Sequence, residues 1–284
     1  MKTIKSLIIL IALSVGITSC SDDNENPMPV TENPLEAYNL TSSFEANGHM
    51  LELYSEKEVL TTGYNELYLQ IKDLSTGEYI PNATITWNPV MHMTQMSHSC
   101  PKSEILATEE KTVYKGFVVF QMATNANEYW ELNLEYSFGG TTYTISETIE
   151  VNAPIDGKKT VNVFMGADDT RYVLAMMPLA PEVAINDLSA VLFKMESMMS
   201  FSIVEDYTIT IDPRMPGMGN HGSPNNEDLT YDTTTGNYTG KLSFTMTGYW
   251  KINLQLLNAN DEILKGESVT EENESSSLYF EIEF

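Results

Sequence analysis

Two short stretches of the chain combine methionine with histidine in a way that could hold a metal ion. Residues 91–100 read MHMTQMSHSC, and residues 214–222 read RMPGMGNHG. Each stretch contains two methionines three residues apart, with a histidine two or three residues further on. Thioether and imidazole groups are soft or borderline ligands, and such a set favours Cu(I) over Mg²⁺, Ca²⁺ or Mn²⁺. The spacing lets these groups converge on one ion from a turning loop.

The sequence therefore predicts two copies of a copper or other soft-metal site. The candidate ligands are Met215, Met218 and His221 in the second loop, and Met93, Met96, His98, His92 and Cys100 in the first. Metal binding would favour loss of the thiol proton, so Cys100 could add a thiolate to the first site.

Two other interpretations of the loops remain open. Methionine is flexible and fills irregular gaps, so packing beneath a loop explains one or two of these residues. A methionine-rich loop can also form an adaptable apolar surface for a protein partner. Packing does not easily explain two pairs of methionines that each lie close to a histidine. We therefore expect a metal site, with an interaction surface for another envelope protein as the alternative.

Most of the chain around these loops alternates apolar and polar residues. Examples are ELYLQI at 66–71, YWELNLEY at 129–136 and YTITI at 207–211. This is the periodicity of strands, and the segments are rich in Thr, Tyr, Val and Ile. Short strands with frequent turns predict an all-β fold of two tandem immunoglobulin-like antiparallel β-sandwich domains.

The two halves of the chain repeat one order of landmarks. Strand 83–87 precedes Asn-Pro, and strand 207–211 precedes Asp-Pro. The methionine loops follow, and after them come Tyr-x-Gly at 114–116 and 238–240, then Trp130 and Trp250 at the start of equivalent strands. A fixed order of this kind indicates internal duplication. We expect domains at residues 45–152 and 158–284, separated by a turn-rich stretch.

The second copy carries motifs that resemble a known family. It has Met-Pro-Gly-Met-Gly-Asn-His at 215–221, Tyr-x-Gly at 238–240 and Phe-x-Met-x-Gly-x-Trp at 244–250. This order resembles the YtkA-like domain, which is related to FixH, over roughly residues 185–260. The resemblance implies a small extracytoplasmic β-sandwich often associated with copper handling. The first copy departs from the motif, because Gly and Pro are absent between its two methionines.

The N-terminus predicts a lipoprotein leader. Residues 1–19 contain Lys2 and Lys5, then an apolar run at 7–13 that is too short to span a bilayer as a helix. Residues 17–20, Ile-Thr-Ser-Cys, resemble the lipobox of bacterial lipoproteins. The resemblance implies cleavage before Cys20, lipidation of that cysteine, and attachment to a membrane through the acyl chains.

Residues 20–44 are expected to form a flexible tether, because they are acidic and rich in proline. The acidic cluster at 21–26 resembles the export signal of surface-exposed lipoproteins in some Gram-negative bacteria. We therefore expect an outer membrane lipoprotein exposed on the cell surface, with the periplasmic face as the alternative.

Composition excludes several classes of function. The formal net charge is −25, which argues against nucleic acid as a partner and suits cations. Apart from Cys20 the only cysteine is Cys100, so no intramolecular disulfide is expected. The sequence has no Gly-rich phosphate loop, no Ser nucleophile elbow and no His-Glu-x-x-His zinc helix. We expect a binding protein and not an enzyme.

Overall fold

Alternating apolar residues form antiparallel strands throughout residues 33–284, the part of the chain that the computed structural model describes. In the segment 129–138, for example, Trp130, Leu132, Leu134 and Tyr136 are buried and their neighbours are more exposed. The all-β sandwich class expected from the sequence is confirmed. The signal peptide expected at 1–19, the lipidation expected at Cys20 and the start of the expected tether lie outside the described residues.

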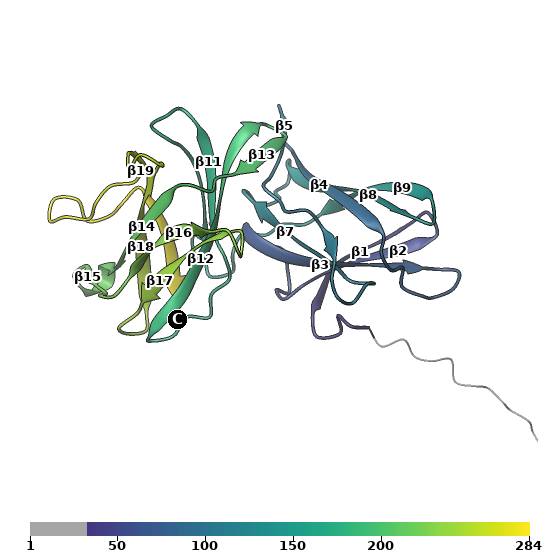
Figure 1. The fold of residues 1–284 in the computed structure, drawn as a ribbon, viewed down its shortest axis with the longest axis horizontal. Coiled ribbons are helices and arrows are strands. Elements are labelled where there is room, and N and C mark those ends of the chain that lie inside the picture. The colour runs from purple at the N-terminus through teal and green to yellow at the C-terminus, as the bar shows by residue number, and fades with distance from the viewer. Residues whose placement is uncertain (1–32) are drawn as a thin grey trace, which may run out of the picture. The chain divides into compact units, whose positions relative to one another are not determined.

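The first half contains nine strands in two sheets (Figure 1). They are β1 (Asn39–Ala46), β2 (His49–Ser55), β3 (Gly63–Asp73), β4 (Thr84–His92), β5 (Ser97–Ser99), β6 (Leu106–Ala107), β7 (Tyr114–Phe120), β8 (Tyr129–Phe138) and β9 (Thr141–Ile149). One sheet has the order β1-β2-β3-β7-β6 and the other has the order β5-β4-β8-β9.

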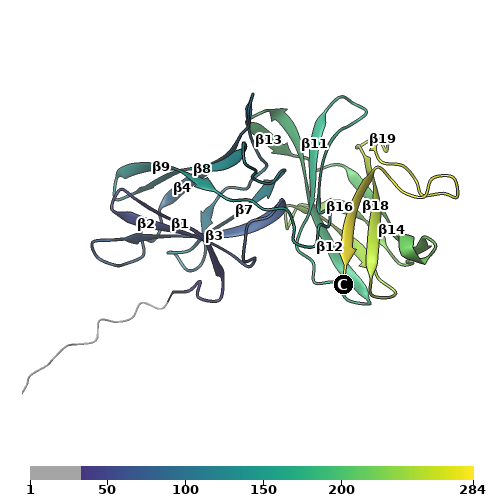
Figure 2. The same cartoon turned by 180° about the vertical axis from the view of Figure 1, so that it is seen from behind.

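The second half follows the same plan. Its elements are β10 (Val161–Met165), β11 (Arg171–Met176), β12 (Ile185–Ser197), β13 (Ser200–Ile203), β14 (Thr208–Met215), the short 3₁₀ helix η1 (Pro216–Met218), β15 (His221–Gly222), β16 (Glu227–Asp232), β17 (Asn237–Ser243), β18 (Tyr249–Leu257), β19 (Ile263–Lys265) and β20 (Leu278–Glu283). The orders β10-β11-β12-β17-β16 and β14-β18-β19 are joined by the pairing of β16 with β14. Figure 2 shows β14, β18 and β19 of this half from behind.

Equivalent positions in the two halves also make equivalent hydrogen bonds. The indole Nε1 of Trp130 donates to the Met122 carbonyl at 2.9 Å, and that of Trp250 donates to the Met246 carbonyl at 3.0 Å. Both indoles are fully buried. Duplication of one unit would produce this shared strand order and bonding.

Two hydrophobic cores surround these tryptophans, one in each half. A third cluster joins the halves, because Tyr64 and Val119 pack with four side chains of β11 and β12: Val173, Ala175, Val191 and Phe193. By its contacts the whole of Asn33–Phe284 is one compact unit. The division into domains at 45–152 and 158–284 therefore stays a prediction.

The expected tether ends earlier than residue 44. Leu35 is buried against Tyr54 and Tyr68, and β1 already begins at Asn39. Phe44 also lies in the core of the first half. The prediction of a flexible segment is wrong for 33–44, because apolar anchors such as Leu35 and Phe44 stabilise that stretch by burial.

Candidate metal-binding pocket

The first methionine–histidine loop is a tight connection between two paired strands. β4 pairs with β5 so that Met91 lies opposite His98, and His92 lies opposite Ser97. The Met93 N–H donates to the Met96 carbonyl at 2.9 Å and closes the turn. Residues directly opposite each other in an antiparallel pair share a face of the sheet. The register therefore places His98 on the inward face with Met91, which is fully buried.

Methionine side chains from both halves surround one cavity beside this loop. The cavity has a volume of about 280 Å³ and is lined by Met93, Met96, His98, Gln121, Met122, Val163, Arg171, Met195 and Met198. Three of these residues, Met93, Met96 and His98, were predicted as ligands from the sequence. We call this cavity the methionine pocket.

His98 is oriented in the methionine pocket by two contacts. Its Nδ1 lies 2.7 Å from the Ser99 carbonyl, and its ring meets the Trp130 ring edge-on at 5.7 Å between centroids. A carbonyl oxygen only accepts, so Nδ1 must carry the proton of this hydrogen bond. In the neutral ring Nε2 then keeps a free lone pair. Metal-ligating histidines are commonly oriented in this way, through a bond from the other ring nitrogen.

The second half contributes to the methionine pocket through the β12–β13 hairpin. Met195 ends the regular pairing of β12 with β13, and Met198 lies in the turn. The Ser99 N–H donates to the Met198 carbonyl at 2.8 Å, which holds the hairpin turn against β5 (Figure 1). This hydrogen bond places Met198 next to Ser99, whose carbonyl orients His98.

Two polar residues of the pocket affect what it can bind. Gln121 has a buried Oε1 with no hydrogen-bond partner in the structure, so a donor or a cation in the cavity would satisfy it. Arg171 carries a positive charge at the exposed side of the pocket. That charge opposes the binding of a cation, and it favours a ligand that brings negative charge.

Two predicted ligands of the first loop do not line the methionine pocket. His92 stacks on Tyr129 with ring centroids 5.0 Å apart, and its Nε2 lies 3.4 Å from a Glu131 carboxylate oxygen. Cys100 is buried in the core of the first half, and burial raises the pKa of its thiol far above the usual range. The structure thus gives Cys100 no role as a thiolate beside this pocket.

The second predicted loop pairs two of its candidates across a strand ladder but does not bury all three around one cavity. Met215 is buried in the core, whereas Met218, on η1, and His221 are exposed. The register pairs Met215 with His221, as it pairs Met91 with His98. Met215 therefore corresponds in the fold to Met91, although its three-residue spacing from Met218 matches the spacing of Met93 and Met96.

Three lining methionines were missed by the sequence analysis. Met195 and Met198 lie about a hundred residues from the first loop in the chain, and Met122 lies after β7. The signal for them was present in the unusual total of 16 methionines and in the run KMESMM at 194–199. Nothing in a linear pattern says that this run packs against residues 93–98.

The described residues contain no group of three or more His, Cys, Asp or Glu side chains that could hold a metal ion. The thioethers of the methionine pocket are a different class of ligand.

Comparisons with known proteins do not identify a family. No family model matches the chain, and no curated protein matches it. Among solved structures the chain is similar to a DUF4785 family protein from Legionella pneumophila, at 10% identity and a TM-score of 0.25. The match covers 77% of this chain and 56% of that protein, so the chain spans little more than half the length of its match. Within residues 33–284 no helix has the length and apolar character needed to cross a bilayer.

Proposed function

We propose that this protein is a membrane-anchored lipoprotein of the cell envelope that binds Cu(I) in the methionine pocket. The observation that carries the proposal is the set of side chains around one cavity. Five methionines (Met93, Met96, Met122, Met195 and Met198) and the oriented imidazole of His98 line it. Its role would be to capture copper, to deliver it to another protein, or to provide resistance to it.

The donor set favours one ion over its competitors. Thioether sulfur is a soft ligand that suits Cu(I), whereas Mg²⁺, Ca²⁺ and Mn²⁺ prefer carboxylate, carbonyl and water oxygens. Zn²⁺ is normally held by thiolate, imidazole and carboxylate ligands. Here Cys100 is kept as a buried thiol, so His98 supplies the one borderline donor among soft ones. The methionine pocket therefore fits Cu(I) better than Zn²⁺.

The proposed location follows from the leader and not from the folded part. Lipid on Cys20 would hold the protein at the outer membrane, with exposure on the cell surface expected and the periplasmic face as the alternative. The resemblance of residues 185–260 to YtkA-like domains supports a role in copper handling outside the cytoplasm. The motifs of this resemblance lie in the second half of the chain, whereas the methionine pocket draws its lining from both halves.

A second candidate function is an interaction surface for an envelope protein. Three apolar residues of the methionine pocket are well exposed: Met96 at 54%, Met198 at 41% and Val163 at 42%. Clustered exposed apolar side chains mark interaction sites in soluble proteins. Arg171 at the same place would suit a partner with an acidic group near an apolar anchor.

Substitution of Arg171 separates the two functions. If the pocket binds Cu(I), Arg171→Gln removes a repelling charge and should tighten binding by about threefold, because interactions between exposed charges are worth roughly 0.2–1 kcal/mol. If it binds an acidic partner, the same variant should weaken that interaction. A matched control is Lys194→Gln, which removes a charge from the hairpin without touching the pocket lining.

The direct test is a Cu(I) titration of the mature protein under reducing conditions against a competing chelator. His98→Gln and the double variant Met195→Leu with Met198→Leu should each weaken binding by at least about tenfold, or about 1.4 kcal/mol. Leucine keeps a similar volume, so packing changes little. His221→Gln and Met218→Leu, which change the two exposed candidates of the second loop, are matched controls and should bind as the wild type does. Equal affinity in all five proteins would overturn the proposal.

A further inference from the structure

A second cavity lies where the linker between the halves meets both of them. It has a volume of about 310 Å³, close to the lower end of the range for small-molecule sites. Its lining residues are Lys57, Tyr64, Asp156, Lys158, Thr160, Met176, Met177, Pro178, Leu179, Pro181, Glu281, Ile282 and Glu283. None of them belongs to the methionine pocket. We call it the lysine cavity.

Lys57 brings a positive charge into this cavity without a carboxylate partner. Its Nζ donates to the Tyr64 carbonyl at 2.8 Å and to the Thr61 hydroxyl at 3.1 Å. An ammonium has three N–H donors, so these two bonds leave one N–H unused. Within residues 33–284 no Asp or Glu forms an ion pair with Lys57. Burial lowers the pKa of Lys57 with nothing to offset it, whereas Glu281 partly offsets the effect of burial on Lys159 and Lys251.

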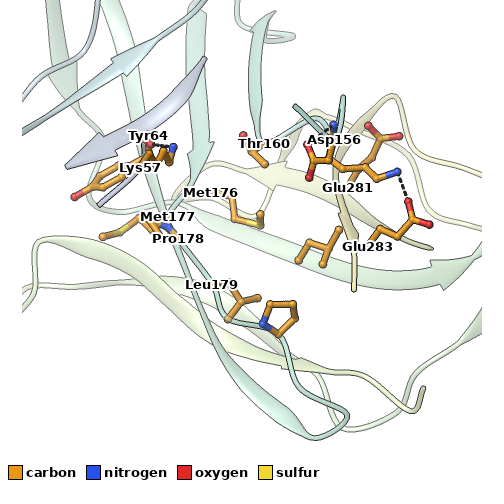
Figure 3. Close-up of a pocket in the computed structure, with 13 residues that line it drawn as sticks. Lys57, Tyr64, Asp156, Thr160, Met176, Met177, Pro178, Leu179, Glu281 and Glu283 are labelled. Atoms are coloured by element: carbon orange, nitrogen blue, oxygen red, sulfur yellow. Dashed lines mark hydrogen bonds and ion pairs between the residues drawn. The ribbon is translucent and has the colours of Figure 1, made fainter. Parts of the chain in front are cut away.

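The acidic residues of the cavity are already occupied at its other end (Figure 3). Glu281 accepts hydrogen bonds from the Tyr249 hydroxyl at 2.6 Å and from the Lys159 N–H at 2.9 Å. Glu283 forms an ion pair with Lys158, and Asp156, the third carboxylate of the lining, accepts a hydrogen bond from the Lys158 backbone N–H at 3.0 Å. These partners hold the carboxylates in place and partly neutralise them. The charge of Lys57 is therefore the one that a ligand would have to complement.

The space between Lys57 and the acidic end is bounded by apolar side chains. Met176 and Leu179 lie there in Figure 3, and Ile282 also lines the cavity. Met176 and Ile282 are largely buried by the protein. The linker is tied on both sides, since the Met176 N–H donates to the Thr160 carbonyl and the Glu281 N–H donates to the Lys159 carbonyl, both at 2.9 Å. The cavity walls are thus formed before any ligand arrives, which lowers the entropic cost of binding.

We propose that the lysine cavity binds a small apolar monocarboxylate. The carboxylate accepts the remaining N–H of Lys57 and neutralises its charge, and the hydrocarbon body covers Met176, Leu179 and Ile282. A charge-assisted bond to a partly desolvated ammonium is stronger than one between neutral groups. Dianions such as phosphate fit poorly, because Glu281 and Glu283 would repel the second charge. The carboxylate can belong to a free organic acid or to the C-terminus of a peptide.

The test compares hexanoate with hexanamide by calorimetry on the mature protein. Hexanoate should bind with a dissociation constant below about 1 mM, and the neutral amide at least about tenfold more weakly. A leucine-ended peptide with a free C-terminus, compared with its C-terminal amide, tests the second source. If either acid binds more tightly than its own amide, the proposal is supported. Comparing the affinities of hexanoate and the free-acid peptide then shows whether the cavity prefers a free organic acid or a peptide C-terminus.

Variants of the cavity provide the controls. Lys57→Met should abolish the preference for the acid, whereas Lys111→Met, at an exposed site elsewhere, should leave it unchanged. Leu179→Trp should block hexanoate with Lys57 intact, which keeps the test meaningful if Lys57→Met folds poorly. No binding of either acid at about 10 mM, equal binding of acid and amide, or full binding by Leu179→Trp would each overturn the proposal. Copper binding should not change in Lys57→Met, because the two cavities share no residue.

Discussion

The three histidines of the methionine loops show how neighbours decide the chemistry of one residue type. His98 is buried and held through Nδ1 by a backbone carbonyl, so its Nε2 is available to a ligand. His92 stacks on Tyr129, with its Nε2 3.4 Å from Glu131 but without a hydrogen-bond partner, and it lies outside the methionine pocket. His221 lies exposed on a two-residue strand. The sequence identified all three as candidate ligands, because each lies within a few residues of a methionine. Only the strand register and the packing around each ring distinguish them.

Cys100 gives a prediction at the same scale. Burial raises the pKa of its thiol, so at pH 8 the thiolate, which is the reactive form, is almost absent from the folded protein. In a chain whose Cys20 has been replaced, a disulfide-exchange reagent should not react under native conditions and should label one thiol per chain in denaturant.

The same experiment with bound copper tests the ligand set. Cu(I) should leave Cys100 as unreactive as it is in the folded apo protein, because this thiol does not line the methionine pocket. Rapid labelling of the folded apo protein that copper suppresses would show instead that Cys100 is an accessible ligand, contrary to the structure.

At the scale of elements, strand periodicity predicts the fold well and the loops poorly. Segments such as β8 bury every second residue, which a linear pattern captures directly. The correspondence between the two loops failed because it was drawn from the distance between methionines, whereas strand pairing equates Met91 with Met215. Register depends on a hydrogen-bonded partner that is distant in the chain. For this reason the sequence revealed the repeat, but it did not reveal which residues of the two loops occupy equivalent positions.

A buried asparagine near the start of each of two equivalent strands tests whether the two halves are stabilised by equivalent hydrogen bonds. Asn65 on β3 donates from Nδ2 to the Gly63 carbonyl, and Asn186 on β12 donates to the Ala184 carbonyl, both at 2.9 Å. Removing one partner of a buried hydrogen bond leaves the other unsatisfied and costs about 1–3 kcal/mol.

We expect Asn65→Ala and Asn186→Ala each to lower the free energy of unfolding by about 1–3 kcal/mol in urea titrations. Asn260→Ala, in an exposed turn, should change it by less than about 0.5 kcal/mol. If Asn65→Ala left the free energy of unfolding unchanged while Asn186→Ala lowered it, the equivalence of these hydrogen bonds in β3 and β12 would be contradicted.

At the scale of the whole molecule, both cavities draw their walls from both halves of the chain. The methionine pocket combines β4–β5 with the β12–β13 hairpin, and the lysine cavity combines Lys57 and Tyr64 with β11, β20 and the linker. The shared hydrophobic cluster supplies the contact between halves, with Phe193 meeting Phe117 edge-on at 6.3 Å between centroids. A sequence read one half at a time cannot reveal sites of this kind, because neither half contains a complete one.

Weakening the shared cluster should therefore weaken the sites. Phe193→Ala should cost about 3–5 kcal/mol as a large-to-small change in a packed core. In calorimetry the wild type should unfold in one transition, and Phe193→Ala should split it into two and weaken Cu(I) binding. Val183→Ala, at an exposed position, should do neither. Two transitions already present in the wild type would contradict this account of the junction.

The most direct test of the central proposal is X-ray absorption at the copper edge of the Cu(I)-loaded mature protein. The methionine pocket predicts a first shell dominated by sulfur with one nitrogen, in wild type and in a variant whose Cys100 is replaced by Ser. It also predicts that the sulfur contribution falls in the double variant Met195→Leu with Met198→Leu. A shell of nitrogen and oxygen only, or a sulfur signal that disappears with Cys100 and is unchanged by loss of the two methionines, would contradict it.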